Sequence, residues 1–341
     1  MLTTAALKVA LALGLDAPLR WLRRRRAVVL MYHGFTDRPS DGVTNYQGNR
    51  LQPSTFARQL DFLSEQCNIV TVRDVVRSLS GGPALPDYSV ALSMDDGYES
   101  IHTLAFPLLL EKKVPATVFV ATQFVDERAP LWPDRLEYAF AEAKGEPGAR
   151  RARLRELQKI AKDLPPGERG AMIASVESEH SRTLILDSTA PSTYRPLSWV
   201  QVRDMVSSGL MEVGSHTHTH TIMTLLSENE ARGELSRSKS LIEKHVGGTC
   251  DLFCYPNGDV GDFNPTTGRL LKDAGFLCGL TTVAGFVDAG NDPFALRRFG
   301  TDDRDSFEKF QITFSVGRHL LQKRSTGPRT TRRCGSRRDA P

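Results

Sequence analysis

Short apolar runs alternate with amphipathic segments along most of this chain. Four of the runs are almost continuously apolar and rich in β-branched residues: 27–31, 68–72, 89–94 and 116–121. Such runs predict strands that are buried on both faces. Residues 55–65 instead carry apolar side chains at helical spacing, and a second helix is predicted around 101–112. Buried strands separated by helices predict a parallel sheet covered by helices.

A charged stretch at 127–195 interrupts this alternation. It predicts two helices, 150–162 and 168–180, and we interpret it as a helical insertion. The alternation then resumes with predicted helices at 199–207 and 227–245, and with predicted strands at 210–213, 252–255, 277–281 and 295–299. The repeated strand–helix units predict an α/β fold, a distorted seven-stranded (β/α) barrel with a helical insertion.

The two ends of the chain differ from the rest in charge. Of the net charge of +4, residues 1–26 contribute +5 and residues 322–341 contribute +6, which leaves −7 for 27–321. We therefore expect a basic N-terminal segment at 1–26, one barrel at 27–321 and a disordered basic tail at 322–341. The acidic body predicts no nucleic-acid binding by the fold itself.

The N-terminal segment has an apolar stretch at 5–15 that is followed by five arginines in 19–26. A secretory signal has its charge before the apolar stretch, so a cleavable signal is not indicated. One interpretation is a short amphipathic helix with a basic collar that rests on a membrane surface. The other is a solvated, frayed terminus. The expected location is cytoplasmic or peripheral to the membrane.

Composition narrows the class of protein further. The 341 residues are 40% hydrophobic and 25% charged, which is typical of a globular protein. No apolar run reaches the roughly 18 to 20 residues of a membrane-spanning helix. Five cysteines without CxxC spacing indicate neither a disulfide framework nor a zinc finger.

Two adjacent carboxylates, Asp95 and Asp96, follow the predicted strand at 89–94. Like charges so close together are costly unless a cation or a proton relieves them. A solvated turn at a strand end is the alternative interpretation.

Three histidines, His216, His218 and His220, lie within five residues directly after the predicted strand at 210–213. In an extended chain His216 and His220 would be about 13 Å apart, too far to share one ion. A helical turn would bring them to about 5 to 6 Å between their Cβ atoms. Two histidines and a carboxylate form a three-ligand catalytic metal site. Both segments follow predicted strands, where a barrel assembles its active site.

The two motifs resemble those of the polysaccharide deacetylases of the NodB-homology type, carbohydrate esterase family 4. Ser93-Met94-Asp95-Asp96-Gly97 resembles the family's Thr-Phe-Asp-Asp-Gly, and His216-Thr217-His218-Thr219-His220 resembles its His-Ser/Thr-x-x-His. The resemblance spans roughly 27–314 without the insertion. It implies that Asp95 is the general base and that Asp96, His216 and His220 bind a divalent metal. Zinc is expected, with cobalt and nickel as alternatives.

A third motif departs from the family. Cys254 stands where the family's Arg-x-Pro-Tyr has its arginine, and Asn257 stands at the tyrosine position. The resemblance implies that the Asn257 backbone N–H is the oxyanion donor. Arg298 resembles a strand arginine that some members place near the catalytic aspartate. Arg297 and a solvated strand end are the competing interpretations.

The candidate general acid comes from a different motif than the one usual in the family. The family's C-terminal Leu-x-His motif is absent, and His33 resembles the histidine that replaces it in members with permuted motifs. A structural role for His33 is the alternative. Tyr255 and Trp132 are candidates for substrate contact, and packing against a helix is the favoured alternative for Trp132.

The resemblance implies metal-dependent hydrolysis of N-acetyl groups on an N-acetylated amino-sugar oligo- or polysaccharide, with release of acetate. The expected context is extracellular polysaccharide or chitooligosaccharide metabolism. Two alternatives stay open: another metal-dependent amidohydrolase acting on a small amide, and a catalytically silent carbohydrate-binding module. The expected partners are an N-acetylated carbohydrate and, through the basic ends, a membrane surface.

Overall fold

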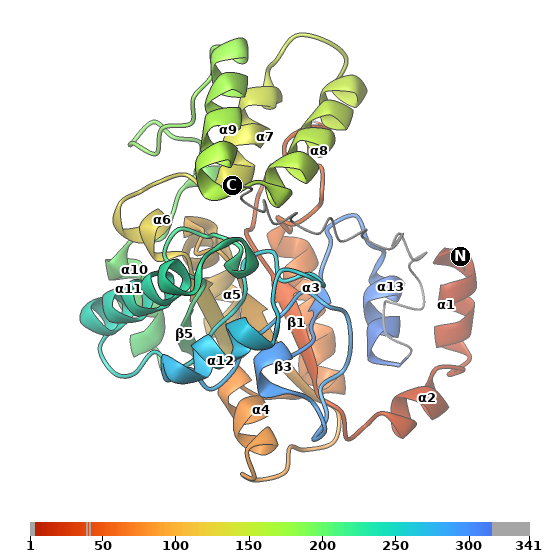
Figure 1. Cartoon of the computed structure of the whole chain (residues 1–341). Coiled ribbons are helices and arrows are strands. Elements are labelled where there is room, and N and C mark those ends of the chain that lie inside the picture. Colours follow the sequence, from red (N-terminus) through yellow and green to blue (C-terminus); the bar gives the residue numbers. More distant parts are fainter. Residues whose placement is uncertain (1–3, 39, 41, 316–341) are drawn as a thin grey trace, which may run out of the picture.

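Parallel strands form the centre of the protein, and helices cover them (Figure 1). The computed structural model describes residues 4–38, 40 and 42–315. Its strands are β1 (Val28–Tyr32), β2 (Asn68–Ile69), β3 (Ser89–Met94), β4 (Ala116–Val120), β5 (Met211–Ser215) and β6 (Phe299–Gly300). The sheet order is β5-β4-β3-β1-β6, with β2 on β3, and every pairing is parallel. The predicted α/β fold with a parallel sheet is confirmed.

Single parallel bridges complete the ring between β5 and β6. They join Ser215 to Phe253, Cys254 to Leu280, and Leu280 to Leu296. The predicted strands at 252–255 and 277–281 are therefore wrong as regular strands, and that at 295–299 is reduced to a bridge and the short β6. Glycine is one reason, since a Cβ on Gly279 would lie 2.6 Å from the Tyr255 ring. A glycine at such a close approach weakens strand pairing.

The helices of the described residues are α1 (Thr4–Ala12), α2 (Ala17–Leu22), α3 (Pro53–Gln66), α4 (Val72–Leu79), α5 (Phe106–Lys112), α6 (Thr122–Asp126), α7 (Trp132–Ala141), α8 (Pro147–Asp163), α9 (Pro166–His180), α10 (Trp199–Ser207), α11 (Glu228–Val246), α12 (Pro265–Asp273) and α13 (Phe307–Gln311). The helices predicted at 55–65, 199–207 and 227–245 appear as α3, α10 and α11. The one predicted at 101–112 begins with a π-helical turn at Ile101–Ala105 and continues as α5. None of these helices is long and apolar enough to cross a membrane.

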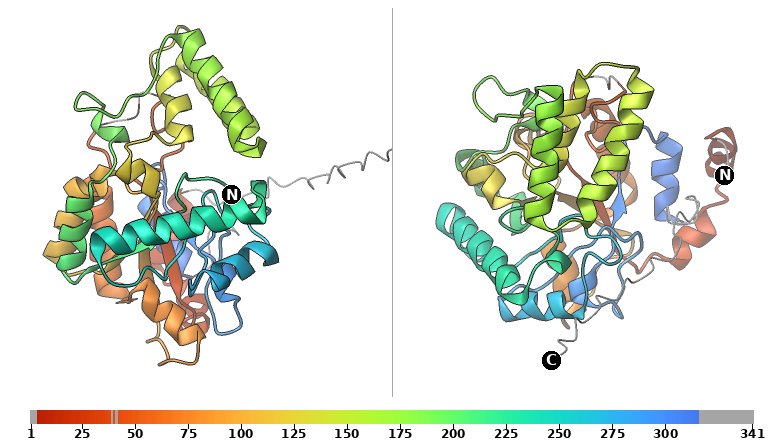
Figure 2. Two further views of the ribbon diagram at one scale, coloured as in Figure 1. Left: turned by 60° about the vertical axis from the view of Figure 1, so that its left-hand side comes forward. Right: turned by 45° about the horizontal axis from the view of Figure 1, so that its top comes forward.

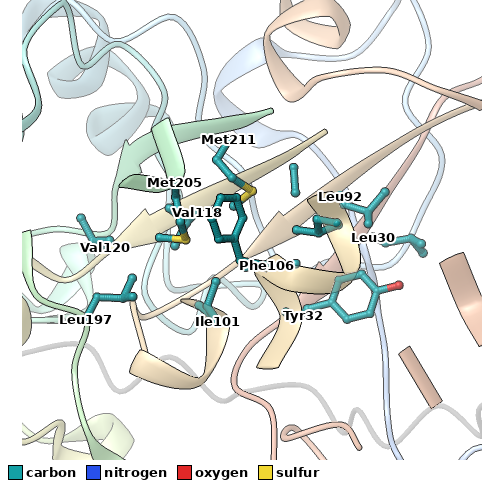
Figure 3. Packing of buried hydrophobic residues seen from close by; sticks show 14 of the residues in the cluster. Leu30, Tyr32, Leu92, Ile101, Phe106, Val118, Val120, Leu197, Met205 and Met211 are labelled. Atoms are coloured by element: carbon teal, nitrogen blue, oxygen red, sulfur yellow. The ribbon is translucent and has the colours of Figure 1, made fainter. Parts of the chain in front are cut away.

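The main core lies between the strands and the helices that cover them (Figure 3). Leu30, Leu92 and Val118 from three neighbouring strands pack in one cluster with Phe106 and Met205 from two helices. Full burial of a side chain of this size contributes about 1.5 to 3 kcal/mol. This core therefore fixes the strand ends, where the candidate site lies.

The insertion forms a separate group of three helices, α7, α8 and α9, on one side of the barrel (Figures 1 and 2). Its own cluster includes Leu136, Leu154 and Ile173. The helices predicted at 150–162 and 168–180 correspond to α8 and α9, whereas the sequence reasoning did not predict α7. An ion pair connects the insertion to the barrel, since Lys162 Nζ of α8 lies 2.9 Å from Asp262 Oδ2.

The N-terminal segment forms two short helices beside α13. Leu7 of α1 is buried, and Lys8 pairs with Glu308 of α13 at 3.7 Å. Leu13, Trp21 and Leu22 are all more than half exposed. The predicted disordered tail at 322–341 lies outside the described residues.

Candidate active site

The two adjacent carboxylates at the end of β3 face different partners. Asp95 and Asp96 are both buried, at 2% and 7% exposure. Asp96 has φ = 75°, a left-handed conformation that non-glycine residues rarely adopt. The turn separates the two side chains, so that Asp95 meets an arginine and Asp96 meets two histidines. The sequence predicted a cation near this pair, and the structure places the Arg298 guanidinium beside Asp95.

The histidines that follow β5 converge on Asp96. Its Oδ1 lies 3.4 Å from His216 Nε2 and 3.2 Å from His220 Nε2, and the two imidazole centroids are 5.0 Å apart. The prediction that a helical turn brings them together is wrong. The segment has no helical turn, and Thr217 and His220 adopt left-handed φ values of 63° and 56°.

Glu234 of α11 holds this irregular loop. Its Oε2 accepts the backbone N–H groups of His218 and Thr219, each at 2.8 Å, and its Oε1 accepts the Thr219 hydroxyl at 2.9 Å. These bonds replace the helical hydrogen bonds that the loop lacks. Sequence reasoning missed Glu234, because a glutamate on a charged helix face carries no local signal of such a role.

The donor set of Asp96, His216 and His220 fits a divalent metal. One ligand atom from each lies within 4.8 Å of the others, and all three residues are buried. His216 Nδ1 donates to the Cys254 carbonyl at 2.8 Å. The free lone pair of the ring is therefore on Nε2, which faces Asp96. Three protein ligands of this kind, with further positions open, are typical of catalytic zinc sites.

A second group of donors, Asp95, His216 and Cys254, also clusters within 4.8 Å. Here a cation is already present, because Arg298 Nη1 and Nη2 donate to the two Asp95 oxygens at 2.8 and 2.7 Å. A metal ion beside that guanidinium would be repelled. The Asp96 set is therefore the better candidate.

Arg298 is the buried partner of Asp95. It has no exposed surface, and its Nε donates to the Thr281 carbonyl at 2.8 Å. Its Nη2 lies 3.0 Å from Cys254 Sγ, so an arginine from a different segment occupies the space beside Cys254. Arg297, the competing candidate, is exposed. Burial opposes ionisation of Asp95, but Arg298 outweighs it and holds the pKa of that carboxyl below its usual value.

His33 and Asn257 line the same cavity as the metal-site residues. His33 follows β1, is half-buried, and acts electrostatically on both Asp95 and Asp96. Asn257 has φ = 60°, and the Thr282 hydroxyl fixes its carbonyl at 2.7 Å. The Asn257 N–H makes no hydrogen bond to another described residue.

The cavity has a volume of about 640 Å³, within the usual range for small-molecule sites. Trp132, at the start of α7, lines it and is half-buried, with its Nε1 lacking a hydrogen-bond partner among the described residues. Tyr255 also reaches the cavity. The residue, however, is only 1% exposed, and its hydroxyl donates to the Phe294 carbonyl at 3.0 Å. Substrate contact by Tyr255 and Trp132 stays a prediction.

A buried ionic cluster forms the wall between barrel and insertion, and sequence reasoning missed it. Arg50 donates to Asp134 at 2.6 Å and to Glu137 at 2.9 Å, both on α7. The Tyr98 hydroxyl donates to Asp134 at 2.8 Å, and that of Tyr194 to Glu137 at 3.1 Å. These residues are far apart in sequence, so no local spacing could have predicted the cluster.

Comparisons with known proteins give one family model and several solved structures of similar fold. The family model described as polysaccharide deacetylase matches residues 83–279. The deacetylase PplD of Streptococcus pyogenes is 18% identical, with a TM-score of 0.60 over 85% of this chain and 98% of that chain. IcaB of Ammonifex degensii is 23% identical, with a TM-score of 0.58 over 85% and 97% of the two chains. These likenesses show a shared fold.

A search of curated protein sequences finds no match. The family model nevertheless covers more than half of the chain. Its range includes the two aspartates, the loop at 216–220, here called the histidine loop, and the Pro256-Asn257-Gly258 turn. The chain therefore belongs to the polysaccharide deacetylase family and is a carbohydrate N-deacetylase.

Proposed function

We propose that this chain hydrolyses N-acetyl groups on amino-sugar residues of an oligo- or polysaccharide in a metal-dependent reaction. The convergence of Asp96, His216 and His220 beside a carboxylate with its own cation carries the proposal. Asp96, His216 and His220 would hold the metal. A divalent metal in such a site supplies Lewis-acid polarisation and a lower pKa for water.

The other residues would divide the proton transfers. Asp95 accepts the proton of the water that attacks the acetyl carbon, and Arg298 keeps Asp95 ionised and oriented. The Asn257 N–H donates to the oxyanion that forms as the carbonyl is attacked. His33, in its protonated form, donates to the sugar nitrogen as the C–N bond breaks, so that acetate and an amine leave.

The paired geometry of Arg298 and Asp95 favours this function over a silent binding module. A binding module has no need for a carboxylate that is buried, ionised and adjacent to a metal site. The position of Arg298 also supports the proposal that the chain uses the permuted arrangement of catalytic residues. The free Asn257 N–H supports its assignment as oxyanion donor.

Acetate release from N-acetylglucosamine oligomers tests the function. The metal-loaded enzyme is expected to release acetate, and a chelator is expected to abolish the release until zinc, cobalt or nickel is restored. Asp95→Asn is expected to keep its metal and to lose about 10²-fold or more in kcat. Metal-dependent cleavage of small amides, with no acetate from any sugar oligomer, would instead favour another amidohydrolase.

We also infer a peripheral contact of the N-terminal helices with an anionic lipid surface. Exposed apolar residues, Leu13, Leu15, Trp21 and Leu22, stand beside the arginines of 20–26. Apolar side chains next to a basic collar are typical of helices that lie in a membrane interface.

A further inference from the structure

A row of basic residues on α8 faces the cavity of the candidate active site. Arg155, Lys159 and Lys162 line it together with the metal-site residues. They are four and three residues apart, which puts them on one face of the helix. Leu154 and Leu157 of the same helix are buried in the insertion. The amphipathic pattern of α8 therefore turns its cations toward the cavity.

The carboxylates of the cavity wall already have cationic or imidazole partners. These pairs are Asp95 with Arg298, Asp96 with His216 and His220, Asp134 and Glu137 with Arg50, and Asp259 with Lys162. Arg155 and Lys159, in contrast, form no ion pair with a carboxylate of the described residues. Arg155 lies over the Tyr46 ring, 5.7 Å from its centroid, and both cations are exposed at the cavity.

A third cation lies behind the cavity wall. Arg169 of α9 is 3% exposed, and its guanidinium carbon is 5.4 Å from the centroid of the Trp132 ring. Its Nη1 is buried without a hydrogen-bond partner among the described residues, and burial lowers the pKa of Arg169 with no acid to oppose it. An unpaired buried cation is costly to the fold. The insertion thus keeps a positive potential beside Trp132 that no described carboxylate neutralises.

We propose that Arg155 and Lys159 bind an anionic substituent of the glycan, a carboxylate or a phosphate, close to the N-acetylated sugar. Arg169 adds to the attraction from behind Trp132. The planar guanidinium of Arg155 can donate two parallel hydrogen bonds to two oxygens of such an anion. The ammonium of Lys159 adds a second positive charge. The inference rests on the proposed function, because it places the glycan in the same cavity. It identifies the substrate class as an acidic N-acetylated glycan.

The test compares three oligosaccharides of equal length: a neutral N-acetylglucosamine oligomer, one that alternates N-acetylglucosamine with glucuronate, and one whose N-acetylglucosamine units are joined by phosphodiesters. We expect kcat/KM to be about tenfold higher on one acidic oligomer than on the neutral one. Which acidic oligomer is favoured shows whether the subsite binds a carboxylate or a phosphate. Arg155→Gln and Lys159→Gln should each lower that value about three- to tenfold, mainly through KM. Both changes should lower kcat/KM less on the neutral oligomer than on the favoured acidic one.

Arg153→Gln is the matched control, because it removes the same charge from α8 at an exposed position that pairs with Glu156. It should leave all three reactions unchanged. Raising the ionic strength from about 0.05 to about 0.5 M should remove the preference, since the two cations are exposed.

Two outcomes separate the inference from the proposed function. Equal kcat/KM on the three oligomers in the wild-type enzyme would overturn the anionic subsite and leave the deacetylase function intact. Absence of acetate from every oligomer would contradict the proposed function. In that case calorimetric binding of the same oligomers to the full chain decides the inference, and equal affinity for neutral and acidic oligomers overturns it.

Discussion

At the scale of single residues, the histidine loop gives each of its three imidazoles a different environment. His216 and His220 face Asp96, whereas His218 Nδ1 lies 2.8 Å from the Thr122 hydroxyl and its Nε2 lies 3.6 Å from Glu127. Alternation along a strand would have grouped all three, so the left-handed turns at Thr217 and His220 decide which of them converge.

We therefore expect His216→Ala and His220→Ala to lower the metal content of the purified protein strongly. His218→Ala is the matched control from the same loop and should retain its metal. Elemental analysis of the three variants measures this directly. Equal loss of metal in all three would mean that the loop, and not the Asp96 site, determines binding.

His33 is expected to act on the leaving group. An amine needs a proton as the C–N bond breaks, and a positioned acid contributes roughly 10²- to 10⁴-fold in rate. His33→Ala should therefore reduce hydrolysis of an N-acetyl amide much more than hydrolysis of an activated acetate ester, whose leaving group departs without a proton. Metal content should be unchanged. Similar losses on both substrates would assign His33 a structural role.

At the scale of elements, Glu234 of α11 determines the shape of the histidine loop at 216–220. Glu234→Ala removes three hydrogen bonds from the loop and should weaken zinc binding by about tenfold or more, in line with other partners of metal ligands. Glu228→Ala, on the same helix, removes an exposed ion pair with Arg269 and should leave zinc affinity unchanged. Titration with a competing chelator measures both. Unaltered affinity in Glu234→Ala would show that the ligands hold the loop by themselves.

The buried ionic cluster between α7 and the barrel should make the free energy of unfolding depend on pH. Burial raises the pKa of Asp134 to about 7. The Glu137 carboxylate also raises this pKa, whereas the Arg50 guanidinium lowers it. An unfolded Asp titrates near 3.9. The folded chain therefore holds a proton between about pH 4 and 7 that the unfolded chain has lost, and the free energy of unfolding falls as pH rises through this window.

Asp134→Asn carries no such proton, so its free energy of unfolding should fall less between pH 5 and pH 8. Urea unfolding of wild type and variant at both pH values measures the difference. Glu142→Gln, which changes an exposed carboxylate paired with Arg182, should keep the wild-type slope. An equal slope in Asp134→Asn would show that Asp134 stays ionised in the folded protein.

The sequence predicted some elements well because their physical signal is local. β1, β3 and β4 are almost continuously apolar runs, and α11 begins with a capping box at Ser227. The loop at 216–220 and the pairing of Arg298 with Asp95 depend on contacts between residues that are distant in sequence. Arg298 was a candidate through family resemblance alone. Arg50 and Glu234 carried no pattern at all, because their partners come from other elements.

At the scale of the whole molecule, the charge is concentrated at the ends and the body is acidic. The exposed apolar residues of α1 and α2 extend this asymmetry into a candidate lipid contact. We expect the full chain to bind vesicles that contain phosphatidylserine and to bind neutral vesicles much less. Trp21→Ser should weaken binding, whereas Val260→Ser, an exposed apolar residue elsewhere, should not. Vesicle flotation measures this, and equal recovery with and without phosphatidylserine would contradict it.

The bond between Asp95 and Arg298 also has a consequence for synthesis. The two residues are 203 positions apart, so at about 5 to 20 residues per second the ribosome adds Arg298 about 10 to 40 s after Asp95. Until then the nascent chain lacks the arginine that pairs with this carboxylate in the folded protein, and burying the carboxylate alone would cost several kcal/mol. The candidate active site therefore cannot assemble before Arg298 has been synthesised, and an interrupted chain that ends before Arg298 should not turn over glycan.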